Sequence, residues 1–101
     1  MGYPQTYYVI PEHHMYLSND RSELMFEQHL PLVKKEDLRV EILERSICLD
    51  FKGEGREPVS RCYSLPYDVI PSEADASFDN TVLRIRAKLR TTPYPGRELP
   101  L

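Results

Sequence analysis

Apolar and polar residues alternate with a period of two along most of this chain. In the segment from Val82 to Leu89, apolar residues at every second position from Leu83 onward alternate with basic residues. Successive side chains of a β-strand point to opposite faces of its sheet, so this pattern predicts a strand with one buried side. The same period predicts inward-facing positions in four further segments: Leu24, Phe26, Gln28 and Leu30; Val40 and Ile42; Ile47, Leu49 and Phe51; and Val59, Arg61, Tyr63 and Leu65.

Nine prolines are spread along the sequence and interrupt every stretch long enough for an interior helix. Proline lacks a backbone donor and clashes with the preceding helical turn, so helix interiors exclude it. We therefore expect an all-β domain, with short helical turns only at residues 34–38 and 72–74. Two stacked sheets form the smallest sandwich that hides the apolar faces of these strands.

A chain of 101 residues suffices for one small domain. We expect an apolar N-terminal arm at residues 1–20, the β-domain at residues 21–90 and an extended C-terminal tail at residues 91–101. The arm is rich in tyrosine but too irregular for an amphipathic helix. Aromatic side chains offer a large contact area, which suits either an arm that docks on the sandwich, by adding a strand or covering an edge, or one that binds other proteins.

The formal net charge is −3, with charges of both signs mixed along the chain. Nucleic-acid binding needs a concentrated basic surface, so no nucleic-acid partner is expected. A basic row on the last predicted strand is more simply a solvated face than a phosphate-binding stripe. This row consists of Arg84, Arg86, Lys88 and Arg90.

No apolar run approaches the roughly 20 residues that span a bilayer, and no signal peptide is apparent, so we expect a cytoplasmic protein without a membrane partner.

Cys48 and Cys62 fall in different predicted strands, on the faces opposite the apolar residues. Two free thiols are expected in a reducing compartment, whereas a cross-strand disulfide requires the two strands to pair in register. The two cysteines lack the spacing of a zinc site, and His13 and His14 lie in an extended segment where adjacent side chains point apart. We therefore expect no metal site.

Residues suited to catalysis are not grouped in this sequence. Catalysis needs an activated nucleophile or a paired acid and base held in a cleft. The serines lack a glycine-flanked elbow, and the four glycines are too scattered to form a phosphate-binding loop. We therefore expect neither an enzyme nor a bound cofactor.

Three segments follow one another in an order and at a spacing that resemble a known family. They are LPLVKKEDL at residues 30–38, SLPYDV at residues 64–69 and ASFDNTVL at residues 76–83. They resemble the D-L-P-G-V-K-K-E-D-I, S-L-P-E-D-V and A-x-x-x-x-G-V-L segments in the α-crystallin domain of the small heat-shock proteins. The resemblance covers residues 22–89 and implies an immunoglobulin-like β-sandwich of the α-crystallin type. Members of this family are ATP-independent chaperones that hold unfolding proteins.

The sequence departs from the family pattern at several positions. His29 replaces an acid, and Leu32 and Thr81 each replace a glycine. Glycine supplies a positive φ at little steric cost, so we expect the turn near Thr81 to place its left-handed residue at Asn80. Only residues 54–58 stand where the family has a long loop with an exchanged strand, which argues against strand-exchange dimerisation.

The resemblance also implies where partners bind. The C-terminal Leu-Pro-Leu resembles the family's I-x-I anchor, so Leu99 and Leu101 are expected to dock on a neighbouring subunit and support self-association. The receiving groove is expected at the sandwich edge, bounded by Val40, Ile42, Ala74 and Ala76. Arg61 matches the family's arginine at the subunit interface, and a salt bridge within the domain is the alternative.

The resemblance predicts a stress-response chaperone that needs no nucleotide and captures unfolding client proteins on exposed apolar surface. In the arm, the expected client-binding residues are Tyr3, Tyr7, Tyr8, Ile10 and Tyr16. Two alternatives stay open. One is an adaptor similar to the CS-domain co-chaperones, which binds one folded partner, and the other is an assembly scaffold.

Overall fold

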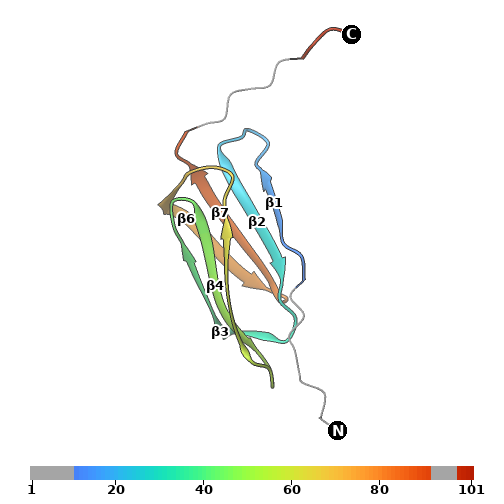
Figure 1. Ribbon diagram of the computed structural model, residues 1–101, viewed down its shortest axis with the longest axis vertical. Coiled ribbons are helices and arrows are strands. Elements are labelled where there is room, and N and C mark those ends of the chain that lie inside the picture. Colours follow the sequence, from blue (N-terminus) through green and yellow to red (C-terminus); the bar gives the residue numbers. More distant parts are fainter. Residues whose placement is uncertain (1–10, 92–97) are drawn as a thin grey trace.

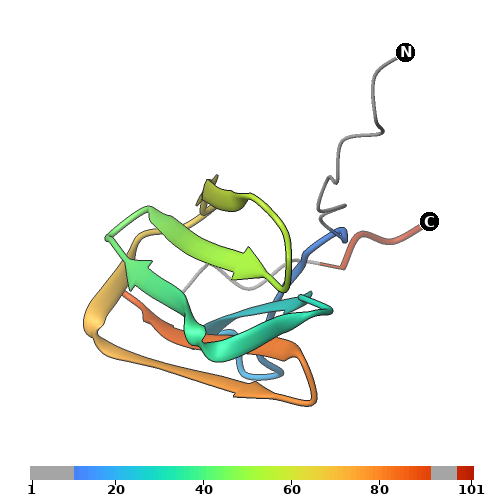
Figure 2. The same ribbon diagram turned by 90° about the horizontal axis from the view of Figure 1, so that it is seen from below.

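Two antiparallel β-sheets stack face to face in this protein (Figures 1 and 2). The computed structural model describes residues 11–91 and 98–101. The strands are β1 (His14–Leu17), β2 (Glu23–His29), β3 (Val33–Ile42), β4 (Ser46–Gly53), β5 (Pro58–Ser64), β6 (Val69–Asp79) and β7 (Val82–Leu89). One sheet has the order β1-β2-β7-β6 and the other has the order β3-β4-β5. The all-β sandwich predicted from the sequence is confirmed.

The core lies between the two sheets and consists of the side chains that face inward in the predicted period. Leu83, Ile85, Ala87 and Leu89 of β7 are all buried, and the residues between them are exposed. The remaining buried apolar residues are Leu24, Phe26, Leu30, Val33, Ile47, Leu49, Phe51, Leu65 and Val69. Hiding these faces from water is the main favourable contribution to folding.

The two helical turns expected at residues 34–38 and 72–74 are wrong, because both segments are extended parts of β3 and β6. Each segment coincides with a shift in strand register, between Val33 and Leu38 in β3 and between Val69 and Ala74 in β6. A β-bulge adds a residue to one strand and interrupts the alternation of faces. The loss of period two at these positions therefore reflects bulges within strands.

Two turns hold ordinary residues in the left-handed conformation that the family pattern fills with glycine. Leu32 has a φ of 67°, and Asn80 and Thr81, which join β6 to β7, have φ values of 49° and 61°. The prediction for Asn80 is confirmed, but Thr81 is left-handed as well. Two positive φ values match the hairpin turn whose twist suits the flanking strands. The sheet therefore imposes this turn on Thr81 despite its branched side chain.

Hydrogen bonds hold Thr81 in its unfavourable conformation. Its hydroxyl donates to the Asn80 carbonyl at 2.5 Å and lies 2.8 Å from His29 Nε2. The second contact is a hydrogen bond between the His29 ring and the Thr81 side chain. The Leu30 N–H also donates to the Thr81 carbonyl at 2.7 Å. These contacts tie the β6–β7 turn to the end of β2.

The connection from β4 to β5 is a short turn. Within it, the Arg56 N–H donates to the Gly53 carbonyl at 2.9 Å, and Gly55 has a φ of 67°. The Glu54 N–H donates to the Leu32 carbonyl at 2.9 Å, which joins this turn to the turn before β3. The structure places no strand between Gly53 and Pro58, as the length of this segment predicts.

The strain at Leu32 can be measured by comparing two glycine substitutions. We expect Leu32→Gly to leave the free energy of unfolding unchanged or raise it by up to about 1 kcal/mol, because relief of the positive φ offsets the added backbone freedom. Leu43 is also exposed and lies in a turn, but its φ is not positive. Leu43→Gly should therefore lower the free energy of unfolding by about 1 kcal/mol. Urea denaturation measures both values, and equal losses would contradict this account of Leu32.

Candidate functional site

The two long edges of the sandwich are closed to different degrees. At one edge, Tyr63 of β5 reaches across to Phe26 and Gln28 of β2. At the other edge, β3 of the three-stranded sheet lies against β6 of the four-stranded sheet. The side chains at these two edges decide which apolar surface a partner can reach.

Residues just before β1 seal the edge between β2 and β5. Gln28 is buried, and its Nε2 donates to the Pro11 carbonyl at 2.9 Å and to the Tyr63 hydroxyl at 3.1 Å. The His13 ring stacks on Phe26, with 5.4 Å between ring centroids, and lies 4.2 Å from the ring centroid of Tyr63. A buried amide with satisfied donors and a cluster of three rings therefore cover the core at this edge.

The described part of the N-terminal arm is docked on the sandwich. Residues 14–17 form β1, which pairs with β2 from His14 opposite Glu27 to Leu17 opposite Leu24. This matches the alternative in which the arm adds a strand. The boundaries predicted at residues 20 and 90 stay predictions. Four of the predicted client-binding residues, Tyr3, Tyr7, Tyr8 and Ile10, lie outside the described residues.

Tyr16 lies on the outer face of β1, away from the core. Its side chain is 47% exposed, and its hydroxyl donates to Glu27 Oε1 at 2.9 Å. This hydrogen bond to a carboxylate favours the protonated phenol and raises the pKa of Tyr16. β1 and β6 are the outermost strands of their sheet, so β2 and β7 separate Tyr16 from the predicted groove residues on β6.

Six inward-facing apolar side chains line the opposite edge, which we call the β3–β6 edge. They are Leu38, Val40 and Ile42 of β3 and Ala74, Ala76 and Phe78 of β6. Each pairs in register with a buried residue of the neighbouring strand, as Val40 does with Leu49 and Ala76 does with Ile85. The six therefore point toward the space between the sheets, yet all six remain partly or largely exposed within the described structure. The β3–β6 edge is an apolar strip that the described residues leave partly uncovered.

All four predicted groove residues, Val40, Ile42, Ala74 and Ala76, belong to the β3–β6 edge. Their role in binding stays a prediction. Sequence reasoning missed Leu38 and Phe78, although each continues the same period-two row by one step. Ala76 is exposed, because an alanine side chain on an outermost strand is too short to close the space beside it.

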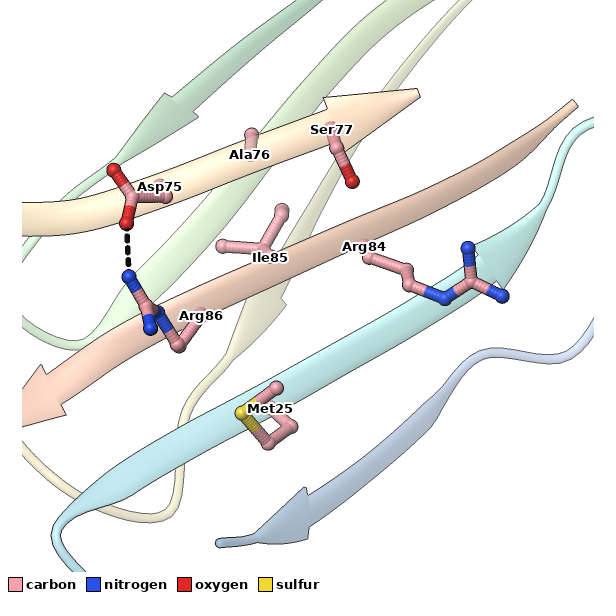
Figure 3. A pocket seen from close by; sticks show the side chains of 7 residues that line it. All are labelled: Met25, Asp75, Ala76, Ser77, Arg84, Ile85 and Arg86. Carbon is pink, nitrogen blue, oxygen red and sulfur yellow. Dashed lines mark hydrogen bonds and ion pairs between the residues drawn. The ribbon is translucent and has the colours of Figure 1, made fainter. Parts of the chain in front are cut away.

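A shallow pocket borders the β3–β6 edge on the outer side of the four-stranded sheet (Figure 3). Its lining residues are Met25, Asp75, Ala76, Ser77, Arg84, Ile85 and Arg86. Asp75 and Arg86 form a hydrogen-bonded ion pair at its rim, whereas Arg84 points away from that pair (Figure 3). The side chains of Asp75, Arg84 and Arg86 make the rim of this pocket charged.

The basic row on β7 is neutralised by carboxylates from both sides. The pairs are Arg84 with Glu27 at 3.5 Å, Arg86 with Glu23 at 3.1 Å and with Asp75, Lys88 with Glu73 at 3.7 Å, and Arg90 with Glu44 at 3.2 Å. The hydrogen bond that Arg86 donates to the Asp75 carboxylate raises the pKa of Arg86. Such exposed pairs contribute little stability each, but they leave little net positive charge for a phosphate. This arrangement favours the interpretation of a solvated face.

Arg61 lies on the inward side of β5, opposite Leu49, and is exposed. No carboxylate of the described residues forms an ion pair with it, so the alternative of a salt bridge within the domain finds no support there. Among the described strands, β5 pairs only with β4, which leaves its other backbone edge open. The role of Arg61 at a subunit interface stays a prediction.

The cysteines are bonded to each other, so the expectation of two free thiols is wrong. Cys48 of β4 and Cys62 of β5 are directly opposite in register, with their Cα atoms 4.0 Å apart, and they form a disulfide. Sequence could name the strands but could not show that they pair in this register. Both sulfurs lie on the outer face of the three-stranded sheet, away from the core.

The predicted anchor residues do not dock on their own chain in the described structure. Leu99 is 67% exposed, Leu101 is fully exposed, and the last residues extend away from the sandwich (Figure 1). Across residues 11–91 and 98–101, no three acidic, histidine or cysteine side chains gather in a way that could hold a metal ion. The same residues include no helix long and apolar enough to cross a membrane.

Comparisons with known proteins identify the fold. By sequence alone, the chain matches no family model and no curated protein. Its structure is similar to that of heat shock protein 16.0 from Schizosaccharomyces pombe, with a TM-score of 0.73 at 16% identity, covering 92% of this chain and 98% of that one. It is also similar to small heat shock protein AgsA from Salmonella typhimurium, truncated at its C-terminus, with a TM-score of 0.63 at 11% identity, covering 90% and 98%.

A third similar structure is stress-induced protein 1 from Caenorhabditis elegans, with a TM-score of 0.55 at 18% identity, covering 85% of this chain and 97% of that one. Each likeness extends over most of both chains. The chain therefore has the β-sandwich fold of the α-crystallin type that the small heat shock proteins share.

The sealed edge can be tested by removing the Gln28 amide. Gln28→Met keeps the side-chain length but leaves the Pro11 carbonyl and the Tyr63 hydroxyl without their donor, so we expect a loss of about 1–3 kcal/mol in the free energy of unfolding. Hydrogen exchange of the β1 amides should also become faster. The reverse change on the outer face of the same strand, Met25→Gln, should cost less than about 1 kcal/mol. Equal costs would show that the amide has no special role.

Proposed function

We propose that this protein is a small heat-shock protein that binds unfolding proteins without nucleotide and prevents their aggregation. The observation that carries this proposal is the β3–β6 edge, an apolar strip left partly uncovered on a fold shared with small heat shock proteins. Large exposed apolar strips are uncommon on proteins that bind nothing, because they favour association.

The geometry of the β3–β6 edge suits an extended apolar segment. β3 and β6 are each outermost in their sheets among the described strands, so both have backbone groups free to pair. An extended chain can add to such an edge through main-chain hydrogen bonds, while every second side chain enters the apolar strip. Recognition of this kind needs little sequence specificity, which suits a chaperone that meets many unfolding proteins.

The C-terminal tail supplies such a segment from within the same protein. Leu99 and Leu101 are two residues apart and exposed, and Pro100 favours an extended backbone between them. Burying two leucines contributes about 3–6 kcal/mol, which is less than the roughly 8 kcal/mol of a micromolar contact. We therefore propose that tails dock weakly on the β3–β6 edge of neighbouring subunits, and that several such contacts together hold an oligomer.

The tail and a client would compete for the same strip. At rest the tail would cover it, and heating would release the tail because each contact is weak.

The arm residues Tyr3, Tyr7, Tyr8, Ile10 and Tyr16 are proposed as a second client-binding surface. Arg61 is proposed to contact a neighbouring subunit. Cytoplasmic localisation stays a prediction.

One observation favours a second candidate function. The short turn from Gly53 to Pro58 leaves no strand to exchange with a partner subunit. A protein with this sandwich that does not exchange a strand could act as an adaptor for one folded partner or as an assembly scaffold. The two functions differ in their expected mass in solution, because a chaperone of this kind is expected to be oligomeric and an adaptor monomeric.

Adjacent substitutions on β6 test the capture surface. Ala76 faces the β3–β6 edge and Ser77 faces the opposite side, and both are exposed, so each should tolerate a glutamate. Light scattering from a heat-labile enzyme, mixed with equimolar full-length chain and no nucleotide, measures protection. We expect Ala76→Glu to lose most of the protection because a charge enters the apolar strip, and Ser77→Glu to keep it. Equal protection by both variants would argue against this surface.

Removal of the two tail leucines tests self-association. Sedimentation velocity of the full chain should show oligomers, and Leu99→Ser with Leu101→Ser should shift the protein toward smaller species. The two leucines supply most of the buried apolar area of each docked tail, so a tail without them should no longer hold a neighbouring subunit. A full chain that is monomeric and gives no protection at several-fold excess would favour the adaptor.

A further inference from the structure

The disulfide lies at the centre of a cross-strand row on the outer face of the three-stranded sheet. Cys48 pairs with Cys62, while Ser46 pairs with Ser64 on one side and Asp50 pairs with Ser60 on the other. The Ser60 hydroxyl donates to Asp50. The disulfide is thus the covalent link in a row of otherwise weak contacts between β4 and β5.

A covalent link to a neighbouring strand matters more for β5 than it would for β3 or β4. Within the described structure it pairs only with β4, and its inward side chains Val59 and Tyr63 are only half-buried. Arg61, between them, is exposed and adds no apolar packing. An outermost strand with so little burial opens locally at a low cost in free energy, so a covalent tie changes its behaviour strongly.

The two sulfurs differ in their access to solvent. Cys62 is exposed and has the small, exposed side chains of Ser60 and Ser64 beside it on the outer face of β5. Cys48 is half-buried and lies opposite Glu41 of β3, whose carboxylate is on the same outer face. Cys48 is on the central strand, flanked by β3 and β5, whereas Cys62 is on an outermost strand, so an incoming thiolate reaches Cys62 more readily.

We propose that Cys48 and Cys62 form a thiol-exchange site, at which a low-molecular-weight thiol attaches to Cys62 and frees β5 from its covalent tie to β4. The thiolate of the small molecule attacks Cys62 Sγ and forms a new sulfur–sulfur bond. The bond between Cys62 and Cys48 breaks, its electron pair goes to Cys48 Sγ, and that thiolate takes a proton from solvent. The product is a mixed disulfide on Cys62 and a thiol on Cys48.

The reaction can proceed in either direction from this mixed disulfide. A second thiolate that attacks the small-molecule sulfur releases Cys62, so that two thiols are oxidised to one disulfide while the protein disulfide is reduced to two thiols. Alternatively, Cys48 attacks Cys62 Sγ and expels the small thiol, which restores the cross-strand bond. Cys48 is then the resolving cysteine and Cys62 the modified one.

This exchange would set how firmly β5 is held, and it does not depend on the proposed chaperone activity. With the bond closed, β5 is tied to the sheet near its middle. With Cys62 modified, β5 is held by its backbone hydrogen bonds to β4, by the half-buried Val59, and by the contacts of Tyr63 with Gln28, Phe26 and His13. The redox state of the surrounding thiol pool would therefore control the freedom of one edge of the sandwich.

The full chain, fully oxidised at the start, can be equilibrated with glutathione and its disulfide at a series of ratios. After acid quenching and alkylation, intact mass distinguishes the disulfide, the dithiol and the glutathione adduct. We expect all three species within the series, with the adduct mapped to Cys62. A bond that stays closed throughout, or one that opens without any adduct at the intermediate ratios, would overturn the proposal.

Two single-cysteine variants test which sulfur reacts. With glutathione disulfide, Cys62 in Cys48→Ser should form the adduct about tenfold faster than Cys48 in Cys62→Ser. Positions 48 and 62 both lie on the outer face of the sheet, so neither substitution to serine opens the core. Equal rates in the two variants would contradict the proposed difference in access between the two sulfurs.

The effect on β5 can be followed in the unsubstituted protein. Hydrogen exchange of the β5 amides should become about tenfold faster or more when the bond is opened by glutathione, while the amides of β2 and β7 change little. Unchanged exchange in β5, or an equal rise in all strands, would show that the bond does not hold this strand in particular. These readouts need no client protein, so they remain informative even if the chain protects nothing from aggregation.

Discussion

The burial of two apolar sheet faces against each other is the interaction on which the rest of this structure depends. The four-stranded and three-stranded sheets are short, and their inward side chains, from Leu24 on β2 to Leu89 at the end of β7, make up the core of the described residues. A domain of this size has little apolar surface to spare. The edges of the sandwich, where the two faces end, are therefore the places where additional contacts matter most.

The two long edges of the sandwich differ in how far they are covered. At one edge the backbone of Pro11 and the ring of His13 close over Gln28, Phe26 and Tyr63. At the other, the β3–β6 edge keeps an apolar strip partly exposed, and a pocket with a charged rim lies beside it. The outer face of the larger sheet carries matched charges, which keep that side unsuited to apolar partners. The proposed binding surface therefore lies at an edge, where the backbone of β3 and β6 is also available.

The fold imposes its backbone geometry on two turns even where the side chains disfavour that geometry. Leu32 and Thr81 occupy positions at which the resembling family has glycine, and both adopt a positive φ. The turn at Asn80 and Thr81 must follow the twist of β6 and β7, which neither residue can alter. Local preference therefore yields to the register of the sheet, and the hydrogen bonds that Thr81 forms with Asn80 and with His29 offset part of the strain.

The sequence alone determined which residues face inward, because period-two alternation reports burial directly: Leu83, Ile85 and Ala87 are buried as that pattern predicts. It also placed Val40, Ile42, Ala74 and Ala76 on one edge, but only through the resemblance to a family. Residues 34–38 and 72–74 were wrongly predicted as helical turns and belong to strands, since bulges interrupt the alternation on which the prediction relied. The sealing of the core by Pro11 and His13, the exposure of Arg61 and the bond between Cys48 and Cys62 depend on which strands become neighbours and in which register. Those pairings join residues far apart along the chain, so only the tertiary structure could decide them.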